Sequence, residues 1–149
     1  MPVPVPVPVL CSYPCLCVAD VARSCSYHGQ LLGLVVTADA GWYAELASPG
    51  DPDRIVLALC AADHPSVATA GHGPPGGMLV SVVVTDADAV AARVLVAGGE
   101  IVAPCRDEEF GQRHFLLRDP DGVLLDVIER IRPSTAFLRV LATRRRSRR

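Results

Sequence analysis

Residues 111–129 read GQRHFLLRDPDGVLLDVIE, and this stretch decides the expected fold. Two apolar segments, Gln112–Arg118 and Val123–Glu129, flank the turn sequence Asp-Pro-Asp-Gly at residues 119–122. Proline presets φ for a turn, and the glycine that closes it accepts a positive φ. The sequence therefore predicts two adjacent β-strands joined by a tight turn.

The residues before this pair of strands complete a module. Met78–Val84 reads as an apolar strand, and Asp86 stands where a helix N-cap is expected. Ala87–Ala97 has apolar residues at helical spacing and is followed by Gly99, which we expect to end the helix. Ile101–Ala103 is a further short strand. The order of elements is therefore β-α-β-β-β.

The first half of the chain repeats this order. Asp20 precedes a helical stretch, Val21–Leu32, that ends at Gly33. The spacing from Asp20 to Gly33 equals that from Asp86 to Gly99. The strands expected around this helix are Leu10–Val18, Leu34–Thr37, Gly41–Ala47 and Ile55–Cys60. Two copies of one unit predict an α+β fold built from two tandem modules that share a core.

These features divide the chain into five parts. An extended proline-valine segment (1–9) precedes the first βαβββ module (10–63), a linker loop (64–77), the second βαβββ module (78–131) and an arginine-rich tail (132–149).

Charge is distributed unevenly along the 149 residues. The formal net charge is −2, but six of the fourteen arginines lie in residues 139–149, so the body is acidic and the tail is basic. We expect no nucleic-acid binding by the folded body. The tail is expected to be solvated and disordered; the alternative is contact with nucleic acid, acidic lipid or an acidic partner. With no apolar run long enough to span a membrane and no secretory signal, a cytoplasmic protein is expected.

Six cysteines are many for a cytoplasmic chain. Cys15 and Cys17 are two residues apart in an expected strand, so their side chains point to one face. That arrangement could suit a soft metal ion, but no second cysteine pair at zinc-site spacing follows. We expect these residues to be small apolar packing groups.

The repeat and its motifs together resemble the vicinal oxygen chelate superfamily, which includes glyoxalase I, extradiol dioxygenases, fosfomycin-modifying enzymes and bleomycin-resistance proteins. The resemblance covers residues 10–131. Its matching segments are VADVARS (18–24), LG (32–33), RDEEFG (106–111) and GQRHF (111–115) running into DPDG (119–122). It implies that the strands of both modules form a cup-shaped, barrel-like mixed sheet around a ligand, with the helices outside, often within a homodimer.

Enzymes of this superfamily hold a divalent metal in the cup, and this sequence departs from their ligand pattern. The positions that resemble first-strand ligands are Tyr13 and Leu79, and residues 55–59 (IVLAL) offer no ligand on the last strand of the first module. Asp126 alone stands where the family has a ligand glutamate. One carboxylate does not hold a catalytic metal with useful affinity, so we expect no metal, no other cofactor and no catalytic residues.

The four histidines leave alternatives open. His64 and His72 lie in the linker and could form a separate metal site, although solvated loop histidines are the simpler expectation. His28 lies within the first helix. His114 lies on a strand and could face the cup or the other side, because alternation alone does not decide between them.

The cup is expected to bind a flat or cationic organic molecule. Trp42 is either a ligand-facing aromatic or a core residue, and Arg113 either pairs with Asp126 or braces the turn at residues 119–122. The candidate ligand-binding residues are Tyr13, Trp42, Tyr43, Phe110, Arg113, His114 and Asp126.

Three functions are consistent with these features. The first is a metal-independent protein that binds an antibiotic or an aromatic metabolite, similar to bleomycin-resistance proteins, and is not an enzyme. The second is a lyase or dioxygenase whose divalent metal is held by displaced ligands. The third is an interaction protein whose function lies in the arginine-rich tail.

Overall fold

The computed structural model describes residues 10–66 and 78–146. The expected proline-valine segment, most of the linker and the last three residues lie outside this range. The elements of the first module are β1 (Cys15–Val18), α1 (Val21–Leu32), β2 (Val35–Asp39), β3 (Tyr43–Ser48) and β4 (Asp51–Ala61). Those that follow are β5 (Val80–Val84), α2 (Ala87–Val96), β6 (Glu100–Glu108), β7 (Gln112–Arg118), β8 (Leu124–Arg130) and α3 (Thr135–Arg146).

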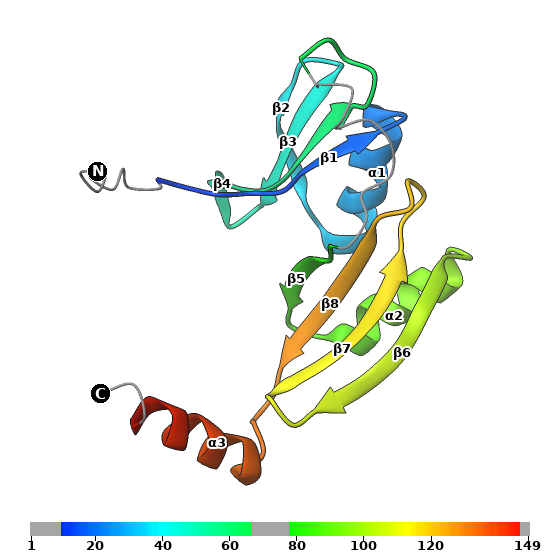
Figure 1. Ribbon diagram of the computed structural model, residues 1–149. Helices are drawn as coiled ribbons and strands as arrows, with labels where there is room; N and C mark the ends of the chain where they lie inside the picture. The colour runs from blue at the N-terminus through cyan, green and yellow to red at the C-terminus, as the bar shows by residue number, and fades with distance from the viewer. Residues whose placement is uncertain (1–9, 67–77, 147–149) are drawn as a thin grey trace, which may run out of the picture.

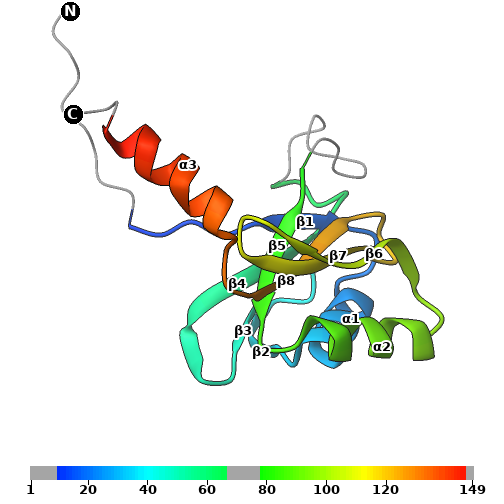
Figure 2. The same ribbon diagram turned by 90° about the horizontal axis from the view of Figure 1, so that it is seen from below.

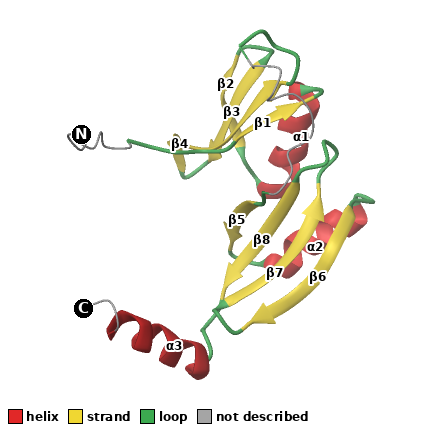
Figure 3. Ribbon diagram, in the orientation of Figure 1, coloured by secondary structure: helices red, strands yellow, loops and turns green. Residues whose placement is uncertain are grey.

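Each module forms one four-stranded mixed sheet with a helix on one face (Figure 1, Figure 3). The strand orders are β1-β4-β3-β2 and β5-β8-β7-β6. The first strand pairs in parallel with the last, and the other pairs are antiparallel. The α+β fold with two βαβββ modules is thus confirmed, but the two sheets do not close into a barrel.

The helix caps follow the sequence in three places and differ in one. The carboxylates of Asp20 and Asp86 accept hydrogen bonds from the third backbone amide of α1 and α2, each at 2.9 Å. Gly33 ends α1 with a φ of 69°, as expected. After α2, however, it is Gly98 that has the positive φ (71°), so the expected role of Gly99 is wrong.

Two strands are longer than the sequence predicts, and one helix was not predicted. β4 begins at Asp51 and β6 reaches Glu108, because pairing with β3 and β7 continues through residues that read locally as turns or loops. The tail, expected to be disordered, forms α3, which projects from the end of β8 (Figure 1). No helix in the described part of the chain is long and apolar enough to span a membrane.

The core lies between the sheets and their helices. On β7 and β8, Phe115, Leu117, Leu125 and Val127 are buried in it. Because side chains alternate along a strand, their neighbours point to the opposite face. We call this face, the one of each sheet that faces away from its helix, the cup face.

A turn of the second module binds the helix of the first. In the view of Figure 2, α1 and α2 lie side by side, and they are in contact. The Asp121 carboxylate lies 2.7 Å from the Arg23 guanidinium and accepts a hydrogen bond from the Ser24 hydroxyl. The imidazole of His28 lies 3.4 Å from the second carboxylate oxygen of Asp119, and both side chains are fully buried. Five charged or polar side chains thus join the modules.

Asp119 also shapes its own turn. Its Oδ1 accepts hydrogen bonds from the backbone amides of Asp121 and Val123, both at 2.8 Å. Gly122 has a φ of 85°, as the turn sequence predicted.

We predict that Asp119→Ala lowers the free energy of unfolding by about 2–3 kcal/mol, because it leaves buried amides without an acceptor. Urea unfolding measures this difference. Asp53 is exposed, and its side chain makes no hydrogen bond or ion pair with the described residues, so it provides the control: Asp53→Ala should change stability by less than about 0.5 kcal/mol. Equal effects of the two variants would contradict the role given to Asp119.

Candidate functional site

On the cup face of the second sheet, the imidazole of His114 lies between two carboxylates. Its Nδ1 is 2.7 Å from an Asp126 oxygen, and its Nε2 is 3.2 Å from a Glu108 oxygen. The His114 side chain is 15% exposed, and Asp126 is buried. Two ionisable groups thus hold a third in a fixed orientation.

Strand alternation brings these residues together. Since Phe115 and Leu117 point into the core, His114 and Leu116 point to the cup face. In the β7–β8 register, Leu116 lies opposite Asp126 and His114 lies opposite Ile128, which makes His114 and Asp126 diagonal neighbours on one face. The structure therefore settles the open orientation of His114 in favour of the cup face.

Glu108 enters the site from β6. It is not among the predicted site residues, because the strand expected in this region ended at Ala103. β6 instead continues to Glu108, whose side chain is largely covered and also pairs with the exposed Arg106. Had β6 been extended to the turn at residues 109–111, alternation would have placed Glu108 on the same face as His114.

The electrostatics of the three groups are mutually dependent. Burial has the largest influence on His114 and lowers its pKa, but the hydrogen bonds and negative charges of Asp126 and Glu108 outweigh it, so the net pKa of His114 is raised. The hydrogen bond from His114, supported by Arg106, holds the pKa of Glu108 below its usual value. The imidazolium form of His114 is therefore favoured, flanked by two carboxylates.

Aromatic rings border one end of this site. Phe110 makes an edge-to-face contact with His114, with ring centroids 6.3 Å apart, and a second such contact with Phe137 of α3. Phe137 was not among the predicted site residues, because the tail was expected to be disordered. Phe110 itself is 43% exposed, which leaves part of its ring free to contact a ligand.

A cavity adjoins the other end of the site. Ser81 of β5 lies opposite Asp126 in the β5–β8 register, on the same face. It lines a cavity of about 540 Å³ together with Val83, residues of β4 including Arg54 and Ile55, and Ser12. This volume is in the range of small-molecule sites. Phe110, His114, Asp126 and Ser81 thus form a row that leads to the cavity.

Both expectations for Arg113 are wrong. Its guanidinium binds Asp88 of α2 through two hydrogen bonds of 2.8 and 2.9 Å and binds Asp107 through a third of 2.8 Å. Residue 113 has the opposite strand parity to His114, so its side chain lies on the helix side of the sheet. The turn at residues 119–122 is instead bound by Arg23.

The aromatic candidates of the first module form a separate group. The Tyr43 hydroxyl donates a hydrogen bond to Glu45 at 3.0 Å, and it also interacts with Tyr13; burial is the main cause that raises its pKa. Trp42 is 40% exposed and stacks on His64 at 3.7 Å, so it does not fill the core. Among the described residues, no hydrogen bond or ring contact joins this group to His114.

The residues of the cup do not fit the divalent metal of the superfamily's enzymes. Asp126 and Glu108 occupy opposite nitrogens of the His114 ring, and a metal ion binds one ring nitrogen, so the three groups cannot ligate a single ion in this arrangement. Tyr13 and Leu79, at the positions that resemble first-strand ligands, carry a phenol and an alkyl group. Of the linker histidines, His64 bonds Ser66 at 2.8 Å and His72 lies outside the described residues.

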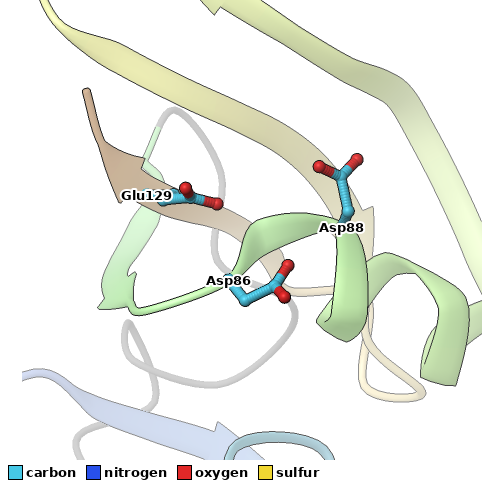
Figure 4. Close-up of side chains that lie close together, drawn as sticks. All are labelled: Asp86, Asp88 and Glu129. Carbon is cyan, nitrogen blue, oxygen red and sulfur yellow. The ribbon is translucent and has the colours of Figure 1, made fainter. Parts of the chain in front are cut away.

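One acidic cluster lies elsewhere on the second module. The carboxylates of Asp86, Asp88 and Glu129 lie close together where α2 begins beside β8 (Figure 4). Each already has a partner: Asp86 and Glu129 accept backbone amides of the first turn of α2, and Asp88 binds Arg113. These contacts explain the cluster as the N-terminal anchor of α2.

Two paired βαβββ sheets with a polar cup face define the class of protein, and comparisons give the family. The model of the Glyoxalase/Bleomycin resistance protein/Dioxygenase superfamily matches residues 11–127. The chain therefore belongs to this superfamily, as its sequence motifs suggested. A comparison with curated proteins gives no match.

Solved structures show the same fold. A glyoxalase/bleomycin resistance protein/dioxygenase from Nocardioides is 21% identical, with 87% of each chain covered and a TM-score of 0.63. A superfamily member from Sphaerobacter thermophilus DSM 20745 is 20% identical over 81% of this chain and 98% of that one, also with a TM-score of 0.63. TioX from Micromonospora sp. ML1 is 24% identical over 80% and 97%, with a TM-score of 0.61.

The raised pKa of His114 predicts a pH-dependent contribution to stability. A group whose pKa is raised by folding stabilises the fold fully below its unfolded pKa of about 6.5, and this contribution is lost as pH rises through the folded pKa. We expect His114→Gln to cost about 1.5 kcal/mol at about pH 5.5 and less at about pH 9. Urea unfolding at both pH values measures this, with His64→Gln as the control. A cost that grows with pH would contradict the raised pKa.

Proposed function

We propose that this protein is a metal-independent binding protein for a small organic molecule, bound on the cup face of the second sheet. The observation that supports this most strongly is the imidazole of His114 fixed between Asp126 and Glu108. Buried polar groups held in advance in one geometry are typical of sites that orient a ligand. The placement of the two carboxylates on opposite nitrogens of His114 also argues against one metal ion shared by the three residues. It therefore argues against the alternative of a metal-dependent lyase or dioxygenase.

The ligand that suits this site is a planar aromatic cation. Phe110 offers an exposed ring at one end for stacking. Glu108 and Asp126 supply two carboxylates, of which the imidazolium of His114 offsets one. Arg106 pairs with Glu108 but is itself 67% exposed, so this ion pair is weak and a cationic group of the ligand can replace it.

The remaining expectations belong to the same proposal. An aromatic antibiotic or metabolite is the ligand class, and drug resistance by sequestration is the corresponding role. Within one copy, no described contact joins the Tyr13–Trp42–Tyr43 group to the His114 group. A homodimer would allow the first group of one copy to face the second group of the other copy. We propose the cytoplasm as the compartment, in which the free cysteines stay reduced.

Proflavine, a planar aromatic cation, tests this proposal by fluorescence titration in buffer with EDTA. We expect saturable binding by the wild type and at least tenfold weaker binding by Asp126→Asn and by Glu108→Gln, because each variant removes a negative charge from the site. Phe110→Ala should also weaken binding. Raising the pH through the pKa of His114 should strengthen it, since the site then loses a positive charge.

Arg106→Gln is the matched control, because it removes a neighbouring charge of opposite sign. It should leave proflavine binding unchanged or make it tighter. The anion 9-anthracenecarboxylate should bind at least tenfold more weakly than proflavine. Equal affinity for the cation and the anion, or proflavine binding that neither charge variant changes, would refute the proposed site.

A further inference from the structure

Three of the six cysteines lie on the cup face of the first sheet. Cys17 of β1 lies directly opposite Cys60 of β4 in the parallel register, and the neighbouring pair, Leu16 and Leu59, points into the core. Cys17 and Cys60 therefore point to the cup face side by side. Cys15, two residues before Cys17, points the same way. None of them is part of a disulfide.

The spacing of this pair fits a particular coordination geometry. Neighbouring strands are about 4.8 Å apart, and side chains at paired positions leave the sheet in parallel. A metal–sulfur bond is about 2.3 Å long, so a linear sulfur–metal–sulfur unit spans about 4.6 Å. Two cysteines on adjacent strands can thus be bridged by one ion without moving the backbone.

We propose that Cys17 and Cys60 bind one monovalent thiophilic ion of the Cu(I) class as a linear dithiolate. Soft thiolate ligands favour such ions over Mg²⁺ or Ca²⁺. Zinc and iron need further ligands. Among residues 10–66 and 78–146, the one group of three or more close metal-ligating side chains is the acidic cluster at α2, so no such set surrounds the pair.

The surroundings suit entry and retention of an ion. Cys60 is 4% exposed, whereas Cys17 is only partly covered and Cys15 is exposed. An ion therefore approaches the pair from the side of the β1 cysteines. Burial raises the pKa of Cys60, and the charge of Cys17 adds to this, whereas a hydrogen bond with Ser66 acts in the opposite direction. The raised pKa therefore favours the protonated thiol of Cys60.

Binding of Cu(I) releases the protons of both thiols. Two thiols and one Cu(I) give a Cys–S–Cu–S–Cys unit of charge −1 and two released protons, and neither sulfur nor copper changes its oxidation state. Affinity should therefore rise up to about a hundredfold per pH unit below the thiol pKa values. A site with one cysteine ligand would show about a tenfold rise.

Competition with the Cu(I) chelator bathocuproine disulfonate, without oxygen, tests the proposal. The background is the full chain with Cys11→Ala, Cys25→Ala and Cys105→Ala, which keeps the three cysteines of the cup face. We expect this protein to bind one equivalent of Cu(I). Adding Cys17→Ala or Cys60→Ala should weaken binding at least a hundredfold, whereas adding Cys15→Ala, the matched control, should weaken it at most tenfold.

X-ray absorption of the wild-type protein with one equivalent of Cu(I) provides a readout that needs no variant to fold. We expect a first shell of two sulfur atoms. A shell containing nitrogen or oxygen would overturn the proposal. Equal Cu(I) affinity of the folded Cys17→Ala and Cys15→Ala proteins would also overturn it. The same holds if the reduced protein has no measurable Cu(I) affinity and forms a Cys17–Cys60 disulfide in air.

Discussion

The buried carboxylate of Asp119 is the constraint on which the arrangement of the two modules depends. One of its oxygens holds the β7–β8 turn closed through two amides, and the other lies against His28 of the first module. Asp121, in the same turn, binds Arg23 and Ser24. Because this turn sets where β8 begins, it also sets the register of β7 against β8, and with it the position of Asp126 beside His114.

The candidate site follows from that register by strand alternation. Apolar side chains on one face fix β7 and β8 to α2, and the same alternation sends His114 and Asp126 to the cup face. A shift of one residue would bury His114 in the core and separate it from Asp126. The superfamily's cup is therefore kept, but its side chains form a histidine–carboxylate group instead of a set of ligands that converge on one metal ion.

Local sequence signals were sufficient for most of the fold and for part of the site. Capping aspartates and the Asp-Pro-Asp-Gly turn act over a few residues, so α1, α2 and the last hairpin could be predicted from them. Other parts of the site could not be predicted: Glu108, Phe137 and the partners of Arg113. Their contacts depend on how far β6 pairs with β7 and on a tail helix next to Phe110. Tertiary pairing decides such contacts, and short sequence windows do not encode it.

The most direct test of the account is the state of the His114 ring nitrogens, observed by long-range ¹H–¹⁵N correlation NMR with and without one equivalent of Zn²⁺. His114→Gln assigns the signals. If the imidazole is held between Asp126 and Glu108, both nitrogens show the shifts of a protonated, hydrogen-bonded ring at about pH 6, and Zn²⁺ leaves them unchanged. A shift of one nitrogen to the metal-bound position on addition of Zn²⁺ would contradict the account and place a metal centre in the cup.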